Sequence, residues 1–212
     1  MEQEGVIKYS LNFQPERLNP CDQLLQEINA SRKAMIAHGL LGQDNHRYGG
    51  YGFGNISVAI NMSSIQLNEP DIVDQISNSI KRSGVKPQNI ELEVTESLLL
   101  DNPVTLRDTL VQIKKMGIKI SIDDFGTGYS NLGYLKIMDV NTLKIDRSFI
   151  QNMEEETHNK NIVKAIIQIS RSLGVQVVAE GVETAVVAES LQAMNCQIGQ
   201  GYFWAKPLVE EE

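Results

Sequence analysis

Two hydrophobic patterns alternate along the chain from residue 56 onward. Short segments rich in β-branched residues alternate with period 2, as strands do, and longer segments repeat apolar residues every three or four positions, as amphipathic helices do. The expected strands are Ile56–Ile60, Ile90–Val94, Ile118–Ile122, Thr142–Ile145 and Val175–Ala179; the expected helices are Asp71–Arg82, Val104–Met116, Asn159–Leu173 and Thr184–Met194. This alternation predicts the α/β class with parallel strands, in a closed barrel or an open doubly wound sheet.

Local signals support several of these boundaries. Gly84 and Gly174 follow two of the expected helices, where a glycine often takes the left-handed conformation that ends a helix. Thr184 precedes a third helix as a predicted N-cap. A last short segment reaches Gln200 and is expected to add one more strand.

The first 55 residues follow a less regular pattern. Val6–Phe13 predicts a strand that ends at Gln14-Pro15, and Cys21–Leu41 has the apolar spacing of a helix. Residues 42–54 are rich in glycine and predict a loop. We expect residues 1–55 to be an atypical N-terminal segment that completes a barrel formed mainly by residues 56–212.

Polar residues collect where the expected strands end. Carboxyl ends of parallel strands share one edge of the sheet, so these side chains are expected to form one site. A single acid at such a position could simply cap a helix. Polar residues at six successive strand ends favour a functional site instead. The residues are Asn61, Glu93, Asp123, Asp124, Lys144, Glu180 and Gln200.

The chemistry of this set points to divalent metal ions. Its ligands are oxygen-rich and include no Cys or His, which suits Mg²⁺, Mn²⁺ or Ca²⁺ better than structural zinc. The adjacent Asp123 and Asp124 repel each other unless a cation, a shared proton or water lies between them. With the other carboxylates they fit a two-metal site that orients a phosphate ester and activates water. Lys144 would stabilise charge, orient that water or move a proton; the alternative is a plain salt bridge.

Composition narrows the choice of partners. The 212 residues carry a formal net charge of −8, which argues against a nucleic-acid duplex or an anionic membrane as the main partner. Cys21 and Cys196 share no metal-like spacing, so a reduced, cytoplasmic setting is expected. The chain starts without the basic and apolar regions of a signal peptide, and no apolar run approaches the ~18 residues that span a bilayer.

Five linked motifs resemble the EAL-domain phosphodiesterases of bacterial cyclic di-GMP signalling. The motifs are Glu93-Val-Thr-Glu96-Ser97, Asp123-Asp-Phe-Gly-Thr-Gly-Tyr-Ser130, Leu143-Lys-Ile-Asp146, Ala179-Glu-Gly-Val-Glu-Thr184 and Gln200-Gly-Tyr-Phe203; Asn61-Met-Ser63 matches the family's Asn-x-Ser. The resemblance covers about residues 56–207. It implies a TIM-like (β/α) barrel that opens cyclic di-GMP to linear pGpG with Mg²⁺ or Mn²⁺.

The resemblance also assigns roles to individual residues. It implies metal ligation by Asn61, Glu93, Asp123, Asp124 and Glu180, and catalytic roles for Asp124, Lys144, Glu180 and Gln200. Glu96 and Glu183 would order the loop around the aspartate pair. Gln14, which matches the family's first Gln-Pro, and Ser63 would bind substrate.

The N-terminal segment departs from the family. The family's second strand bears a Glu-Ala-Leu signature whose glutamate is a metal ligand, and this sequence contains no such triplet. Residues 31–41 and 52–58 instead resemble the start of class II aldolase/adducin proteins, although the zinc histidines of that family are absent. These features predict a chimera, natural or made, with a crossover near Ile56, and an unpaired strand edge that offers a route to homodimers.

Three functions are therefore open. The first is a cyclic di-GMP phosphodiesterase that is impaired by the loss of one metal ligand. The second is a degenerate domain that binds cyclic di-GMP, or a protein, without cutting it. The third is a recombined fold without activity. We favour the first.

Overall fold

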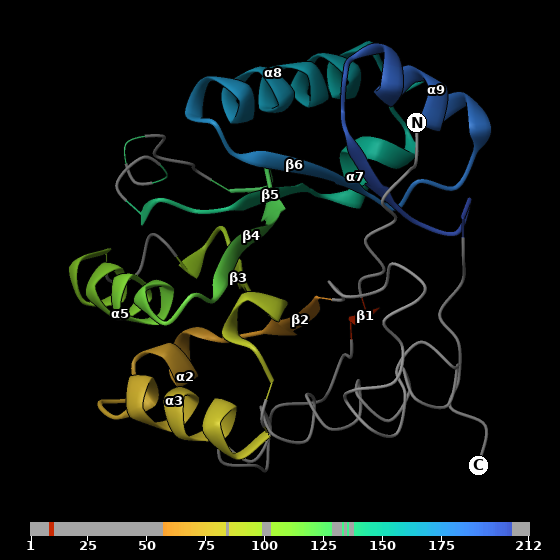
Figure 1. The fold of residues 1–212 in the computed structure, drawn as a ribbon. Coiled ribbons are helices and arrows are strands. Elements are labelled where there is room, and N and C mark those ends of the chain that lie inside the picture. The colour runs from red at the N-terminus through yellow and green to blue at the C-terminus, as the bar shows by residue number, and fades with distance from the viewer. Residues whose placement is uncertain are drawn as a thin grey trace, which may run out of the picture. The chain divides into compact units, whose positions relative to one another are not determined.

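The computed structural model describes residues 9–10, 57–83, 85–98, 103–128, 133, 135 and 138–204. The chain forms two units, one of Met1–Glu93 with Asp108–Lys119 and the other of Val94–Arg107 with Ile120–Glu212. Each unit contains parallel strands joined by helices, as the sequence pattern predicts (Figure 1). The expected helix at 21–41 and the glycine-rich loop at 42–54 lie outside the described residues, as does Gly84.

The first unit is organised around strand β2, Val58–Asn61. It pairs in parallel with β1, Tyr9–Ser10, and with β3, Ile90–Thr95. Between β2 and β3 lie α2, Ser64–Leu67, α3, Ile72–Ser83, and a short 3₁₀ helix, η1, at Pro87–Asn89. The apolar face of α3 is buried through Ile72, Ile76 and Ile80. Helix α5, Pro103–Lys115, has residues in both units and buries Leu106, Leu110 and Ile113.

The second unit contains four consecutive strands that pair in parallel with their neighbours in sequence. They are β4, Lys119–Phe125, β5, Thr142–Ile145, β6, Gln176–Glu180, and β7, Ile198–Gln200. The connecting helices are α7, Arg147–Gln151, α8, Thr157–Leu173, and α9, Ala185–Ala193. Helix α8 lies along β5 and β6 (Figure 1). Its buried Val163, Ile166 and Ile167 build the core between helix and sheet.

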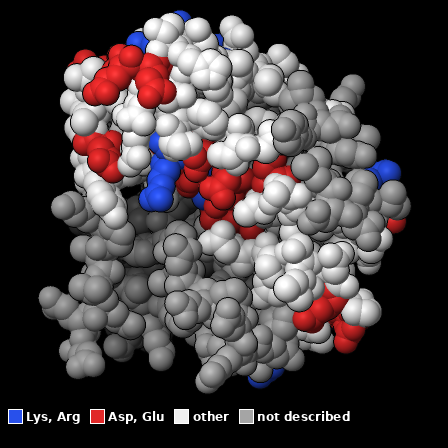
Figure 2. All heavy atoms as spheres, turned by 180° about the vertical axis from the view of Figure 1, so that it is seen from behind, with Lys and Arg blue, Asp and Glu red and all other residues white. Residues whose placement is uncertain are grey.

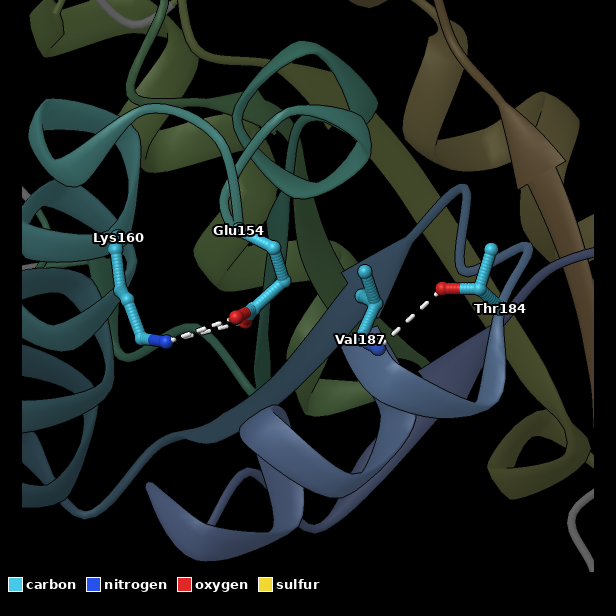
Figure 3. Close-up of polar contacts among 4 residues, drawn as sticks. All are labelled: Glu154, Lys160, Thr184 and Val187. Carbon is cyan, nitrogen blue, oxygen red and sulfur yellow. Dashed lines mark hydrogen bonds and ion pairs between the residues drawn. The ribbon is translucent and has the colours of Figure 1, made fainter.

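Two of these helices have the caps that the sequence predicts. Gly174 follows α8 in the left-handed conformation, with φ 69°, and the Thr184 hydroxyl accepts a hydrogen bond from the Val187 amide at 3.3 Å to cap α9 (Figure 3). Figure 3 also shows Lys160 of α8 paired with Glu154 at 3.1 Å. Both side chains are about one-third exposed, so this pair contributes little to the free energy of folding.

The expected strands and helices after residue 56 are confirmed, with boundaries shifted by at most three residues. The apolar pattern does not predict the two short helices α2 and α7. Each has only four or five residues, which is too short for a helical repeat of apolar residues to be read. Of the strand expected at 6–13, the structure describes β1. None of the described helices is long and apolar enough to cross a membrane.

Candidate metal centre

A β-bulge at the end of β4 gives the centre its shape. Ile122 lies opposite Leu143 and Phe125 opposite Ile145, so Asp123 and Asp124 together face one residue of β5. In a regular strand, two successive side chains would point to opposite faces of the sheet. Asp124 instead has a left-handed backbone, with φ 54°, a conformation that aspartate tolerates better than most residues. Both carboxylates are therefore available on the same side.

Three carboxylates meet beside this bulge. One oxygen from each of Asp123, Asp124 and Glu180 lies within 4.8 Å of the others. Glu180 is the last residue of β6, two strands away from β4, so the approach depends on parallel strands that end at one edge. Figure 2 shows acidic side chains gathered near the centre of one face of the molecule. Oxygen ligands at this density suit a hard divalent cation.

Lys144 lies between two of these acids. Its Nζ atom is 3.0 Å from Asp123 Oδ1 and 2.7 Å from Glu180 Oε1. The Lys144 side chain is 4% exposed, whereas the two carboxylates are 16% and 18% exposed. A buried ammonium needs such partners because its removal from water is costly. Lys144 thus fixes the spacing of Asp123 and Glu180 and offsets part of their charge.

Asp124 is crowded by other acids. Partial burial, followed by the charge of Asp123 and then the charge and hydrogen bond of Asp146, raises the pKa of the Asp124 carboxyl; Lys144 opposes this shift. Asp146 was not among the expected site residues. It could have been found as the last polar residue of the Leu143–Asp146 motif, one position beyond β5. An additional cation at Asp124 would relieve this repulsion.

The loop after the bulge is held by Glu96. This carboxylate is 2% exposed, and its Oε2 atom accepts hydrogen bonds from the amides of Gly126, at 2.8 Å, and Gly128, at 3.2 Å. The Glu96 amide in turn donates to the Asp123 carbonyl at 3.1 Å. A Cβ atom on Gly128 would lie 3.2 Å from the Glu96 carboxylate carbon, so glycine allows this close approach.

Replacing Glu96 by Gln is expected to weaken this loop without unfolding the protein. The glutamine side chain would keep one acceptor oxygen but lose the charge that strengthens both bonds. Removing one charge-assisted hydrogen bond typically costs about 1.5–3 kcal/mol. Hydrogen exchange of the Gly126 and Gly128 amides should therefore accelerate at least about tenfold. Glu69→Gln, in the turn between α2 and α3, is the matched control. Unchanged exchange in Glu96→Gln would contradict the loop-ordering role.

Two further expected residues belong to the first unit. Asn61 and Glu93 lie side by side in the register of β2 and β3, and Glu93 is buried with 3% exposure. Ser63 caps α2: its Oγ accepts from the Gln66 amide at 3.3 Å and donates to Gln66 Oε1 at 3.0 Å. Its expected contact with substrate stays a prediction. Gln14 lies outside the described residues.

The remaining expected residues flank β6 and β7. Gln200 lies opposite Glu180 in the register of these strands, and its carbonyl accepts from the Val182 amide at 3.1 Å. The Glu183 carboxylate accepts from the Gln151 side chain of α7 at 3.0 Å. Glu183 therefore contacts the helix after β5, whereas Glu96 contacts the loop after β4. The structure brings Asp123, Asp124, Lys144 and Glu180 together most closely.

Comparisons with known proteins agree with this arrangement. The signalling protein YkoW of Bacillus subtilis is 40% identical over 158 residues, which are 74% of this chain and 20% of YkoW. The bifunctional diguanylate cyclase/cyclic di-GMP phosphodiesterase MucR of Pseudomonas aeruginosa is 38% identical over 76% of this chain and 24% of its own length. The chain thus spans only a fifth to a quarter of these relatives.

Solved structures show the same fold. The MucR phosphodiesterase in complex with c-di-GMP has a TM-score of 0.75 and 34% identity, over 87% of this chain and 69% of that one. Klebsiella pneumoniae BlrP1, solved with manganese and c-di-GMP, has a TM-score of 0.70 and 26% identity, over 90% and 46%. The fold class is therefore the expected TIM-like (β/α) fold of the EAL type.

The family match also extends further than the motifs alone. The family model described as "EAL domain" matches residues 9–207, a span that includes β1 and most of the segment expected to be atypical. The aldolase-like resemblance of that segment, and the loss of the signature glutamate, stay predictions. With nearly the whole sequence matched, the chain belongs to the EAL domain family.

Proposed function

We propose that this chain is a metal-dependent phosphodiesterase that hydrolyses cyclic di-GMP to linear pGpG. In this reaction, water adds across one phosphodiester bond, the 3′-oxygen leaves as a hydroxyl, and the phosphate stays on the 5′-oxygen. The observation that carries the proposal is the group of three carboxylates around Lys144, built by the β4 bulge at the carboxyl edge of the strands. The names of the similar MucR and BlrP1 structures support the choice of substrate.

The donor set fits divalent metal ions. Asp123, Asp124 and Glu180 supply closely spaced hard oxygen atoms. Partial burial, and then the negative charges of Asp123 and Asp146, raise the pKa of Asp124, and a cation would offset both effects. We propose Mg²⁺ or Mn²⁺ as the ions; the metal-ligand roles of Asn61 and Glu93 stay predictions from the family resemblance. Such ions polarise a phosphoryl oxygen and lower the pKa of a water molecule.

The protein's own residues then position the reacting groups. Lys144 Nζ lies 3.0 Å from Asp123 Oδ1 and 2.7 Å from Glu180 Oε1. These two contacts keep both carboxylates in place as charge changes nearby. We propose that the Lys144 ammonium also orients a water molecule or stabilises developing negative charge. Glu96 fixes the glycine loop that follows the aspartates, and Gln200 lies beside Glu180 on the last strand. These residues act by orientation and charge.

The activity is expected to be impaired. The family's second-strand glutamate has no counterpart in the motifs of this sequence, and two-metal sites lose affinity when one carboxylate is missing. We therefore expect activity to rise with metal concentration into the millimolar range, about 10- to 100-fold above what a complete site would require. Saturation at micromolar metal would contradict the impairment while leaving the proposed reaction intact.

The direct test is turnover by the purified chain. The protein is incubated with cyclic di-GMP and Mg²⁺, then Mn²⁺, and linear pGpG is followed by chromatography. We expect product with either ion and none after chelation with EDTA. If no product forms but the ligand binds, the chain is a cyclic di-GMP receptor; if neither occurs, the proposed function is wrong.

A further inference from the structure

Arg147 occupies a fixed position at the rim of the metal centre. It is the first residue of α7 and directly follows Asp146, whose carboxylate accepts a hydrogen bond from the Ser148 amide at 3.0 Å and another from the Ser148 hydroxyl. These bonds cap the helix and fix the backbone on both sides of Arg147. The same Asp146 lies beside Asp124, where it raises the pKa of that carboxyl. The backbone of Arg147 therefore lies next to the acidic group.

Gly181 brings Arg147 close to the end of β6. A Cβ atom on Gly181 would lie 2.6 Å from Arg147 Cβ and 3.4 Å from its Cα, so only glycine permits this contact. Gly181 also has a left-handed backbone, with φ 71°. Since Gly181 directly follows Glu180, Arg147 is anchored between two residues that border the carboxylates.

The Arg147 side chain is exposed and available to a ligand. Among the described residues, none forms an ion pair or hydrogen bond with its guanidinium group. Lys144, the other cation at this end of β5, is buried and already paired with two carboxylates. Of the two described cations around the end of β5, Lys144 and Arg147, Arg147 is therefore the one that can bind an anion from solvent.

The proposed substrate carries a suitable anion. Cyclic di-GMP has two phosphodiester groups, and hydrolysis at the metals engages only one of them. We propose that Arg147 binds the second, non-reacting phosphodiester through the planar fork of its guanidinium and so positions the dinucleotide over the metals. This inference rests on the proposed function. The role is in binding, so it should change KM and leave kcat nearly unaltered.

The test compares Arg147→Ala with the wild-type chain on two diesters. Cyclic di-GMP has a second phosphate, and bis(p-nitrophenyl) phosphate has none. Arg147→Ala should raise KM for cyclic di-GMP about tenfold, with kcat within about twofold, and should leave kcat/KM for the small diester unchanged. Arg147→Lys, which keeps the charge but loses the fork, should recover part of the loss.

A matched control removes an arginine from the other end of the strands. Arg171 lies in the last turn of α8, just before β6 begins, and donates to the Asn195 carbonyl at 3.4 Å. Arg171→Ala should leave both substrates unaffected. An equal loss on both substrates in Arg147→Ala, or no loss on either, would overturn the inference.

A binding experiment separates this inference from the proposed function. Calorimetric titration of cyclic di-GMP in Ca²⁺ should show about tenfold weaker binding by Arg147→Ala. If the wild-type chain binds but does not turn over, the proposed reaction fails while this ratio still tests Arg147. Equal affinities of the two proteins, or no binding by the wild type, would refute the role of Arg147.

Discussion

Asp123→Asn is expected to lower the rate of cyclic di-GMP hydrolysis about 100- to 1,000-fold while leaving the fold intact. Asp123 accepts a hydrogen bond from Lys144 at 3.0 Å and lies in the group of three carboxylates. Asparagine has the same shape but is neutral and replaces one ligand oxygen with an NH₂ group. The change therefore weakens metal binding and loosens Lys144 without creating a cavity. Initial rates at saturating Mn²⁺, with thermal unfolding in EDTA, measure the two effects separately.

Asp139→Asn is the matched control for this experiment. Asp139 is an exposed aspartate with a left-handed backbone, φ 52°, in the turn before β5, at the opposite end of the strand from the carboxylates. Asparagine tolerates this conformation as well as aspartate does. Asp139→Asn should keep wild-type turnover. Unchanged turnover in Asp123→Asn would show that the activity comes from another site or from a contaminant.

Lys144→Met is expected to destabilise the metal-free protein by about 2–4 kcal/mol. The substitution keeps the length of the side chain but leaves Asp123 and Glu180 without their shared cation. Breaking a fully buried ion pair costs about 3–5 kcal/mol, and partial exposure of the two carboxylates lowers this value. Denaturant unfolding in EDTA gives the difference. Added Mn²⁺ should restore part of the stability, since a ligand that binds only the folded state stabilises it.

Lys160→Met supplies the comparison for Lys144. Lys160 pairs with Glu154 at a similar distance, 3.1 Å, but both side chains are about one-third exposed (Figure 3). Its loss should cost less than about 1 kcal/mol. Because the ion-pair distances are similar, the ratio of the two losses of stability measures the effect of burial. Equal losses of stability in the two variants would mean that the ion pairs of Lys144 contribute no more than an ordinary surface salt bridge.

Much of the second unit could be predicted from local sequence patterns. Thr142–Ile145 forms a strand because its apolar and β-branched residues pack against α8, and Gly174 ends that helix as expected. The placement of Asp123, Lys144 and Glu180 at one edge followed from parallel strands alone. These features depend on periodicity and on residues whose backbone preferences are strong.

Other features of the site could not be read from the sequence. The left-handed Asp124 depends on how β4 pairs with β5, and strand pairing is a tertiary property. The contact of Arg147 with Gly181 joins two strand ends that are more than 30 residues apart. Asp146 caps α7 and also lies beside Asp124, and the motif alone does not show the second contact. Pattern analysis finds the elements, but packing decides which of their end residues meet.

Because of the bulge in β4, this site depends on the number of residues in the strand as well as on which residues they are. Because Asp123 and Asp124 share one position opposite β5, deleting either residue would restore an even ladder and leave a single carboxylate at that position. Phe125, which is buried with 3% exposure, would keep its place opposite Ile145. Point substitutions can adjust the chemistry of this edge gradually, but a single-codon deletion would remove it in one step.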